Sequence, residues 1–559
     1  MKNINKNFVV ILLATSLFAS SCKKDLNVGN PNQPTLQANV TTDDGLIALT
    51  LGGVYNNGLG NGKLGWLGNS FFSLPYGYSE LLGDMVSAEA SNQIVNIVNV
   101  PDYFILDDLT KIATPSPTRT VLRTNNNRAS SASGVNPFYY HWVSMYALNN
   151  ACNTVLDNIE KVTYSGGDAD SKKKTIKAFC YWWKGYAYGQ IGSMYYAGLI
   201  NDLPNQVNPN YVSKEAIIAQ SNSCYNQATG LLTSITSTPT YKDVMTQLIP
   251  TFCQVGNGGV LTIDEFKRNI NTMLARNILV NKLNPFVNGN LASTITGASI
   301  LSMTAADWAS VKTLTTDGIR LGDKVFSAHS TAANGFTTAQ SGNVAANATG
   351  PNAGTTFKVS ERFLQNFRTG DLRKSNNFNT SNIFSSAGSF GTRYSQIDGG
   401  NGASGVYVYG AKAVGAYEIY MAGSFEENAL MFAEANIMSG AVPAGVTLIN
   451  SVRTYQGSGL VPLITTITQL QAMKELVSER RVSLVYRGLS FYDSRRWGWI
   501  YDISKGGGSY GNTLISGASN TVNTNATINY NFLDYWDVPA DEYELNPPSS
   551  GSAPIKNPN

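Results

Sequence analysis

The stretch that decides the fold lies near the C-terminus and reads Ser478-Glu-Arg-Arg-Val-Ser-Leu-Val-Tyr-Arg-Gly-Leu-Ser-Phe-Tyr-Asp-Ser-Arg-Arg-Trp-Gly498. Apolar residues recur at helical spacing into its first half. The same spacing brings Arg480 or Arg481 onto or beside the apolar stripe. An arginine in that position needs a partner, and Glu479 and Asp493 are the nearest candidates.

The order of residues in this stretch resembles the C-terminal signature of the SusD/RagB family. It runs from Glu479-Arg480 through Arg487-Gly488 to Arg496-Trp497-Gly498. Members are surface lipoproteins of Bacteroidota that capture nutrients for a TonB-dependent outer-membrane transporter. The resemblance implies a mainly α, SusD-like fold, with tetratricopeptide-like helix pairs as scaffold and a loop-rich irregular lobe. We expect Gly488 to cap the first helix, and the signature's charges to join two helices without touching a ligand.

The resemblance covers nearly all of the chain after its leader. It is dense at both helical ends and thin between 285 and 415. The tail carries Val538-Pro539 where the family more often has Ile-Pro. The remaining matching elements are Trp142, Tyr146, Asn153, Leu156 and Ile159, then Asp371-Leu-Arg373, then Leu430, Phe432 and Ala433-Glu434-Ala435, and then the short helix at 448–453.

Helical periodicity divides the chain into a scaffold and an irregular part. We predict one SusD-like domain at 37–559, with a Gly-, Asn-, Ser- and Thr-rich lobe at about 285–415. Long irregular stretches of this kind are usually functional surface or packed insertions. The scaffold is expected mainly at 37–60, 136–283 and 417–500, with individual helices at 40–60, 138–159, from 171 onward, 213–234, 265–283, 305–319 and 417–438.

The N-terminus has the pattern of a bacterial lipoprotein leader. Lys2 and Lys6 precede an apolar run of eleven residues from Phe8 to Phe18, too short to span a bilayer. Ala19-Ser-Ser-Cys22 matches a lipobox, and ordinary secretion with an incidental cysteine is the alternative. We therefore expect a signal peptide at 1–21, lipid on Cys22, and a tether at 22–36 that anchors the protein to a membrane. The resemblance to the SusD/RagB family implies that this is the outer membrane and that the protein faces the cell exterior.

Composition favours binding by stacking and neutral hydrogen bonds. Of the 559 residues, 14% are charged and 11% aromatic, with 29 Tyr and 8 Trp. The net charge is +3, and removal of Lys2 and Lys6 with the leader leaves about +1. Bulk charge therefore attracts neither nucleic acid nor an anionic membrane, and we expect no nucleic-acid partner.

The four cysteines that remain after Cys22 have no metal-binding spacing. An even count in an exported protein permits disulfides. Positions beside apolar residues in helical patterns favour buried free thiols. These cysteines are Cys152, Cys180, Cys224 and Cys253.

Recognisable catalytic motifs are missing from the sequence. The two histidines, His141 and His329, stand in no metal-ligand spacing, and no GxSxG, HExxH or P-loop occurs. Gly60 to Gly65 matches GxGxxG, but no strand precedes it, so we reject nucleotide binding. We expect no enzyme, no cofactor and no metal site.

The candidate ligand site lies in the aromatic-rich stretch after the first helix. Sugar rings present apolar faces that stack on aromatic side chains, while their hydroxyl groups bond to Asn, Asp, Gln and Arg. In the family, ligand contacts commonly come from these loops and from the central lobe. The alternative is that half or more of these aromatics simply pack the core. The candidate residues are Trp66, Tyr76, Tyr78, Asp84, Asn92 and Tyr103, with Trp308 from the lobe.

Three functions remain open at this point. The first is a glycan-binding lipoprotein that acts as a lid on a SusC-like TonB-dependent transporter, in polysaccharide utilisation. The second has the same lid architecture but captures peptides, as RagB-type members do. The third is a scaffold that binds only protein. An exposed aromatic platform favours the first, a closed cavity with paired charges the second, and the lack of a concave polar site the third.

Overall fold

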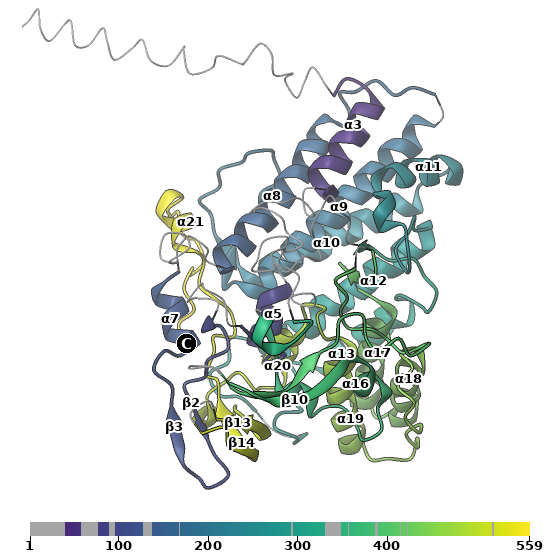
Figure 1. The fold of residues 1–559 in the computed structure, drawn as a ribbon. Coiled ribbons are helices and arrows are strands. Elements are labelled where there is room, and N and C mark those ends of the chain that lie inside the picture. The colour runs from purple at the N-terminus through teal and green to yellow at the C-terminus, as the bar shows by residue number, and fades with distance from the viewer. Residues whose placement is uncertain are drawn as a thin grey trace, which may run out of the picture.

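Helices that pack side by side dominate the described part of the chain (Figure 1). The structure is a computed structural model. Within its described residues, no helix has the length and apolar character required to cross a bilayer. It describes residues 40–56, 76–88, 96–126, 137–166, 168–291, 294–329, 348–355, 357–385, 390–413, 415–421, 423–516 and 519–559.

A first group of helices forms the upper part of the molecule in the view of Figure 1. The group consists of α3 (Asp43–Thr50, continued by a π turn at Leu51–Asn56), α8 (Pro137–Asn158), α9 (Ala169–Met194), α10 (Lys214–Thr233), α11 (Thr238–Leu248) and α12 (Ile263–Val280). α8 contacts α9, α9 contacts α10, and α10 contacts α12. The approach of α9 to α10 requires glycine, because a Cβ on Gly185 would lie 2.7 Å from the ring of Tyr225.

A second group continues the stack toward the C-terminus. It consists of α13 (Ala305–Thr316), α17 (Phe425–Met438), α18 (Val442–Tyr455), α19 (Gln469–Ser483) and α20 (Ser490–Arg496). α13 joins the two groups, since it contacts both α12 and α17, and α19 packs on α17 and α18. Shorter helical segments are α5 (Tyr76–Leu82), α7 (Thr118–Thr124), α15 (Glu361–Leu364), α16 (Leu372–Asn377), α21 (Ala540–Leu545), η3 (Thr251–Cys253), η4 (Asn352–Gly354) and η5 (Ile503–Lys505).

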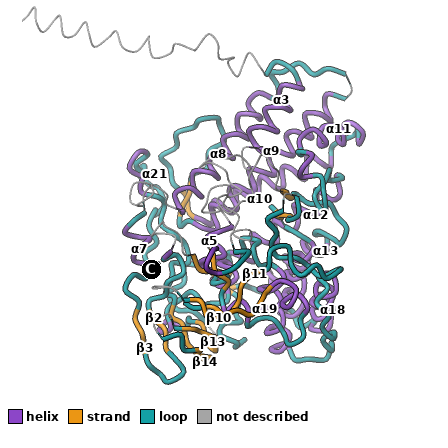
Figure 2. Tube along the Cα trace, in the orientation of Figure 1, coloured by secondary structure: helices purple, strands orange, loops and turns teal. Residues whose placement is uncertain are grey.

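The strands are short and lie mainly in the lower half of the molecule (Figure 2). One antiparallel sheet has the order β13 (Ser509–Ile515), β14 (Val522–Asn529), β2 (Tyr103–Ile105) and β3 (Lys111–Ala113), so it joins segments about 400 residues apart. The other strands form two-stranded pairs: β1 (Val86–Ala88) with β9 (Phe357–Val359), β10 (Phe378–Phe384) with β11 (Thr392–Gln396), β8 (Ser327–His329) with β12 (Glu418–Tyr420), β4 (Ala197–Gly198) with β5 (Val212–Ser213), and β6 (Lys282–Leu283) with β7 (Leu301–Ser302).

The mainly α prediction is confirmed, and two of its details are wrong. The helix expected from Tyr417 begins at Phe425, because the residues before it pair as strand β12 with β8. Gly488 does not cap α19, which already ends at Ser483. The physical reason is Glu80, whose carboxylate accepts the backbone N–H groups of Tyr486 and Gly488 at 3.1 Å each.

The four cysteines of the described chain are free and buried. Their positions in the core agree with the expectation of apolar thiols, and no disulfide joins them. They are Cys152, Cys180, Cys224 and Cys253.

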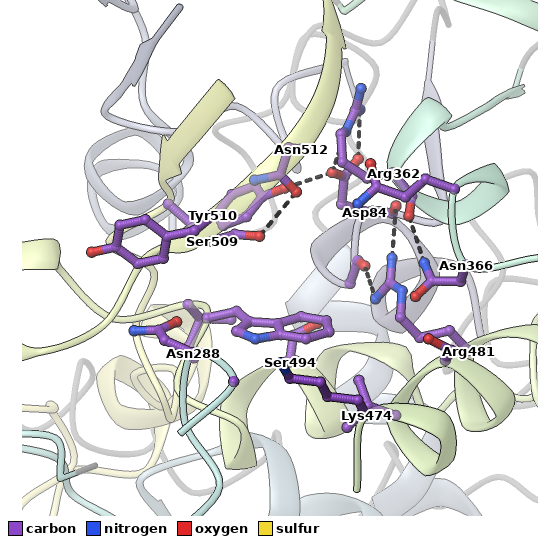
Figure 3. Close-up of a pocket in the computed structure, with 18 of the residues that line it drawn as sticks. Asp84, Asn288, Arg362, Asn366, Lys474, Arg481, Ser494, Ser509, Tyr510 and Asn512 are labelled. Carbon is purple, nitrogen blue, oxygen red and sulfur yellow. Dashed lines mark hydrogen bonds and ion pairs between the residues drawn. The ribbon is translucent and has the colours of Figure 1, made fainter. Parts of the chain in front are cut away.

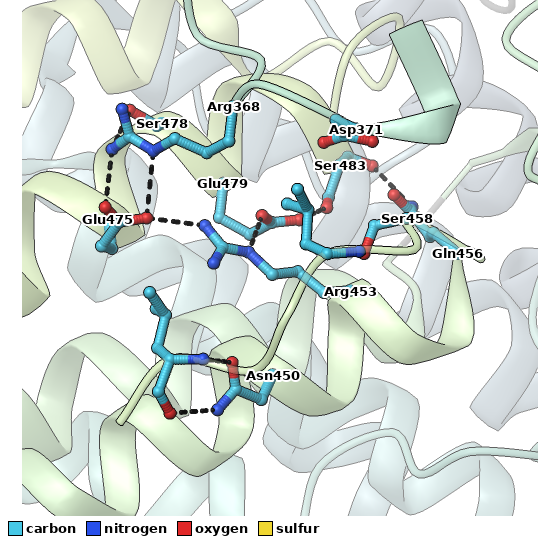
Figure 4. A network of polar contacts seen from close by, with 12 residues as sticks. Arg368, Asp371, Asn450, Arg453, Gln456, Ser458, Glu475, Ser478, Glu479 and Ser483 are labelled. Carbon is cyan, nitrogen blue, oxygen red and sulfur yellow. Dashed lines mark hydrogen bonds and ion pairs between the residues drawn. The ribbon is translucent and has the colours of Figure 1, made fainter. Parts of the chain in front are cut away.

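Buried charges bind α19 to the elements around it (Figure 4). Glu479 accepts from Arg373 of α16 at 2.6 Å and from Arg453 of α18 at 2.7 Å. Burial alone would raise the pKa of Glu479, but the two guanidinium groups lower it to about 2. Arg453 also donates to Glu475, which lies one helical turn before Glu479 on α19, at 2.7 Å. Three helices therefore meet at one carboxylate.

A second buried network lies between α19 and α20. Arg480 pairs with Asp493 at 3.0 Å, one of the pairings that the sequence left open. Asp493 also accepts from Arg496 at 2.7 Å, and Arg496 continues to Glu434 of α17. Arg495 donates to backbone carbonyl groups of three separate segments, including that of Val280 at the end of α12. The signature thus joins helices from both groups of the stack.

Replacement of Glu479 by Gln is expected to lower the free energy of unfolding by about 3 kcal/mol, because Arg373 and Arg453 then lose their shared buried carboxylate. Chemical denaturation at pH 7 measures this loss.

The matched control is Asp157→Asn. Asp157 pairs with Lys161 at 2.7 Å, but both side chains are about half exposed, so the expected loss is about 0.5 kcal/mol or less. Equal small losses in both variants would contradict a structural role for the buried network.

Candidate functional site

A cavity lies between α19, the turn after α5, α15 and strand β13 (Figure 3). Its volume is about 420 Å³. The lining residues run from Leu82 to Tyr530, so segments far apart in the sequence build it together. This volume lies within the range of small-molecule sites. We refer to it below as the α19 pocket.

One face of α19 forms the floor of this pocket. Lys474, Val477, Ser478 and Arg481 all line it, and their spacing of three, four and seven residues places them on one side of a helix. The neighbours Glu479 and Arg480 point away into the buried networks. Adjacent residues of the signature therefore differ in their surroundings: Glu479 and Arg480 lie in buried networks, whereas Arg481 lines the candidate pocket.

Asp84 anchors the wall next to α19. It accepts from Arg362 at 2.7 and 2.8 Å, from Ser360 at 3.0 Å and from Tyr530 at 2.5 Å. Burial alone would raise its pKa, but Arg362 and the other donors hold the pKa below its usual value. Its backbone lies in the left-handed region at φ +53°, a costly conformation for aspartate that these bonds stabilise.

The glycine before Asp84 lets this turn approach α20. A Cβ on Gly83 would lie 2.4 Å from the side chain of Ser490, so no other residue fits without a shift of the backbone. The carbonyl groups of Gly83 and Asp84 then face Arg481, which donates to them at 3.1 and 3.3 Å. The turn and the helix therefore position each other.

Four aromatic residues line the pocket; Phe286 and Tyr530 are buried, and Trp499 and Tyr510 are the more exposed pair. Trp499 follows the signature directly and is half-buried, with the Arg481 guanidinium 5.3 Å from the centre of its ring. Tyr510 stands on strand β13 and is 50% exposed. Its hydroxyl group donates to the carbonyl of Gly507 at 3.3 Å, which orients the ring. These rings offer apolar faces to a ligand.

Amide side chains complete the rim, and they bond to the protein itself. Gln365 donates to Gly511 and accepts from the backbone of Thr513 at 2.7 Å. Asn366 donates to the carbonyl of Arg362 at 2.6 Å. The remaining pair of lining amides behaves alike: Asn288 donates to Gly506 and Gly507, and Asn512 donates to Ala526 and accepts from Ser509.

Of the seven ligand residues predicted from the sequence, the α19 pocket contains Asp84. Tyr103 lies on β2 with Lys111 3.7 Å above its ring, and it does not line the pocket. Trp308 is 6% exposed and packs with α12 and α17 in a satellite core. Trp66, Asn92 and the side chains of Tyr76 and Tyr78 lie outside the described residues.

Sequence reasoning did not select the other lining residues. For Lys474 and Arg481 the sequence does offer a signal: they are seven residues apart on a helix whose apolar stripe was recognised, so they lie on the same face. Trp499 carries a weaker signal, since it lies one residue beyond the end of the signature. Tyr510 is one tyrosine among 29 and has no distinguishing context in the sequence.

The described residues hold no group of three His, Cys, Asp or Glu side chains placed to bind a metal ion. His329 lies 3.7 Å from Glu418, and the two ring nitrogens face backbone carbonyl oxygens. These contacts are those of a structural histidine.

Solved structures match the fold over most of its length. A SusD-like carbohydrate binding protein from Bacteroides vulgatus superposes with a TM-score of 0.51 at 14% identity, over 92% of this chain and 98% of that one. A SusD superfamily protein from Parabacteroides distasonis superposes with a TM-score of 0.53 at 12% identity, over 91% of this chain and 99% of that one. A SusD homolog from Bacteroides thetaiotaomicron gives 0.53 at 13%, over 83% and 88%.

The chain has the SusD-like fold. The resemblance inferred from the signature is thereby confirmed in three dimensions. No protein-family model matches the sequence, and no curated protein does. At 12–14% identity the likeness establishes the SusD-like architecture and leaves the ligand to be argued from the α19 pocket.

Glu80 supports the pocket in this SusD-like chain and makes its stability depend on pH. Burial, opposed by the N–H groups of Tyr486 and Gly488, raises the pKa of Glu80 to about 7 from an ordinary 4.5. Between pH 4.5 and pH 7, Glu80 is therefore protonated in the folded state and ionised in the unfolded state. The contribution of Glu80 to the free energy of unfolding is complete below pH 4.5 and falls by about 3 kcal/mol as the pH rises through 7.

We predict that this loss is missing in Glu80→Gln. The free energy of unfolding of the wild type minus that of the variant should fall as the pH rises from 4.5 to 8. Urea denaturation of both proteins across that range measures this difference. A difference that stays constant with pH would contradict the raised pKa.

Proposed function

We propose that this protein captures glycans at the surface of a bacterial outer membrane. It delivers them to a SusC-like TonB-dependent transporter, on which it acts as a lid. The observation that carries the proposal is the α19 pocket, where the part-buried ring of Trp499 and the half-exposed ring of Tyr510 stand beside hydrogen-bonding side chains. The shared fold with a SusD-like carbohydrate binding protein supports it.

The chemistry of the pocket suits a sugar. Pyranose rings have apolar faces that pack on aromatic rings, and Tyr and Trp provide this contact at a low cost in conformational entropy. The rim amides bond to backbone groups, as Asn366 does to Arg362 at 2.6 Å. A rim ordered in this way loses little freedom when a ligand binds.

Peptide capture has less support from the lining. A site for free peptides would need an unengaged carboxylate for the amino terminus. Asp84 is the one carboxylate among the lining residues, and Arg362, Ser360 and Tyr530 already bond to it. A scaffold that binds only protein has less support still, since the described residues contain a concave polar site.

We infer binding without catalysis. Hydrolysis of a glycosidic bond uses two carboxyl groups, one on each side of the bond. Among the residues that line the α19 pocket, Asp84 is the single carboxylate, and its ion pair with Arg362 keeps it ionised. It is placed to hold the wall of the pocket and not to donate a proton.

The first test is Tyr510→Ala and Trp499→Ala in native gels that contain plant, fungal and host polysaccharides. We expect the wild type to be retarded by at least one glycan. Each variant should lose about tenfold or more in affinity, because central aromatic side chains dominate such interfaces. Calorimetry with oligosaccharides of the retarding glycan gives the value.

Two controls accompany this test. Tyr543→Ala removes a part-buried tyrosine of α21 that does not line the pocket, and Trp499→Phe keeps a ring in place. Both should bind like wild type within a few fold, with unchanged melting temperature. Loss of binding in Tyr103→Ala, with Tyr510→Ala unaffected, would move the site to strand β2 of the sheet and contradict the α19 pocket.

Membrane attachment is proposed from the lipobox. Cys22→Ala should abolish lipidation, because the thiol is the atom that receives the diacylglycerol. Mass spectrometry of the N-terminal peptide and fractionation of cells measure the outcome. A variant that still fractionates with the outer membrane and carries lipid would refute Cys22 as the anchor.

A further inference from the structure

The α19 pocket offers a ligand two cationic donors that no carboxylate of the described residues pairs with, beside the neutral hydroxyl groups of Ser478 and Ser494. Each lining amide already donates to a backbone carbonyl, as with Gln365 to Gly511 at 3.4 Å and Asn512 to Ala526 at 3.2 Å. The hydroxyl group of Tyr510 is engaged as well, by Gly507. The neutral donors of the rim are therefore largely used by the fold.

Four cations and one carboxylate line the pocket. Two of the cations have a partner: Arg362 pairs with Asp84 at 2.7 Å, and Arg368 pairs with Glu475 at 2.9 Å. In each pair the two opposite charges neutralise each other. They leave Lys474 and Arg481 as the source of the pocket's net charge.

Lys474 is exposed, and no described residue forms an ion pair or hydrogen bond with its ammonium group. Its aliphatic stem passes 3.8 Å from the Cβ position of Gly289, across the pocket floor. Arg481 is 5% exposed, and the described residues give it carbonyl oxygens and the Trp499 ring as partners, but no carboxylate within ion-pair distance. Both charges face the same cavity from one side of α19.

The carboxylates that act on Arg481 from a longer distance are already compensated. They are Asp84, Glu80 and Asp493. Asp84 is paired with Arg362, and Asp493 with Arg480 and Arg496. Burial raises the pKa of Glu80 to about 7, so it is partly protonated near neutral pH. Burial lowers the pKa of Arg481 itself, which reflects a desolvated charge without a full counter-charge.

We propose that the α19 pocket selects acidic glycans, with uronate carboxylates or sulfate esters held by Lys474 and Arg481 beside the Trp499 ring. The inference rests on the proposed function and names its substrate class. An anionic group on the ligand supplies the missing counter-charge, and a charged hydrogen bond is stronger than a neutral one. A neutral glycan would leave the Arg481 charge desolvated and without a counter-ion.

The experiment compares glycans that differ only in charge. Polygalacturonate is paired with its methyl-esterified form, and chondroitin sulfate with desulfated chondroitin, so that carboxylate and sulfate are tested separately. Calorimetry and native gels at 50 and 300 mM salt are run on wild type, Lys474→Gln and Lys242→Gln. Lys242 is an exposed lysine of α11 that does not line the pocket.

We expect at least one acidic form to bind about tenfold or more tightly than its neutral partner, with affinity that falls as salt rises. Lys474→Gln should remove about tenfold of that preference, and Lys242→Gln should leave it unchanged. Because Lys474 is exposed, this variant is expected to fold. Arg481→Gln is a second variant, to be interpreted only if its melting temperature is retained.

Two results would overturn the inference, and they differ in what they leave standing. Equal affinity for charged and neutral partners, still lost in Trp499→Ala, would refute the acidic preference and retain glycan capture. Binding of peptides with a free C-terminal carboxylate and of none of the glycans, lost in Lys474→Gln, would refute glycan capture and assign the two cations to a peptide terminus.

Discussion

Arginine–carboxylate pairs buried on two sides of α19 are the constraint on which the rest of the structure depends. Glu479 faces the side of α16 and α18 (Figure 4), while Arg480 faces Asp493 of α20. Through Arg496 the second side continues to Glu434 of α17. A buried charge without its partner is strongly unfavourable, so these elements fit together in one arrangement. The residues of the SusD-like signature are thus the ones that fix this packing.

Much of the fold could be predicted from the sequence, because its helices are long and amphipathic. α8, α9, α10 and α12 lie within a few residues of where periodicity places them. Errors occur where a tertiary contact overrides local pattern. α19 ends before Gly488 because Glu80, some 400 residues away, binds the next backbone N–H groups. The sheet that joins β2 to β14 likewise depends on long-range pairing, which periodicity does not encode.

The site was predicted less well, and for a physical reason. Asp84 was selected from an aromatic-rich stretch and does line the pocket, but Trp308 proved to be a core residue. A tryptophan that packs a core and one that faces a ligand look alike in sequence. Arg481 was expected, like the other charges of the signature, to join helices, and in the structure it also lines the pocket. Which of these residues faces the core and which faces the pocket depends on how α19 is rotated about its axis, and the sequence does not give that rotation.

The two walls of the α19 pocket differ in how freely they can evolve. α19 holds Arg481 beside residues that the core cannot exchange, so this wall is tied to the survival of the fold. Tyr510 and Gln365 are exposed on the opposite wall and contact backbone groups more than side chains. Mutations there alter the shape of the pocket rim at little cost in stability. A chain with this architecture can therefore change the surface that its pocket presents one rim residue at a time, while its helices stay as they are.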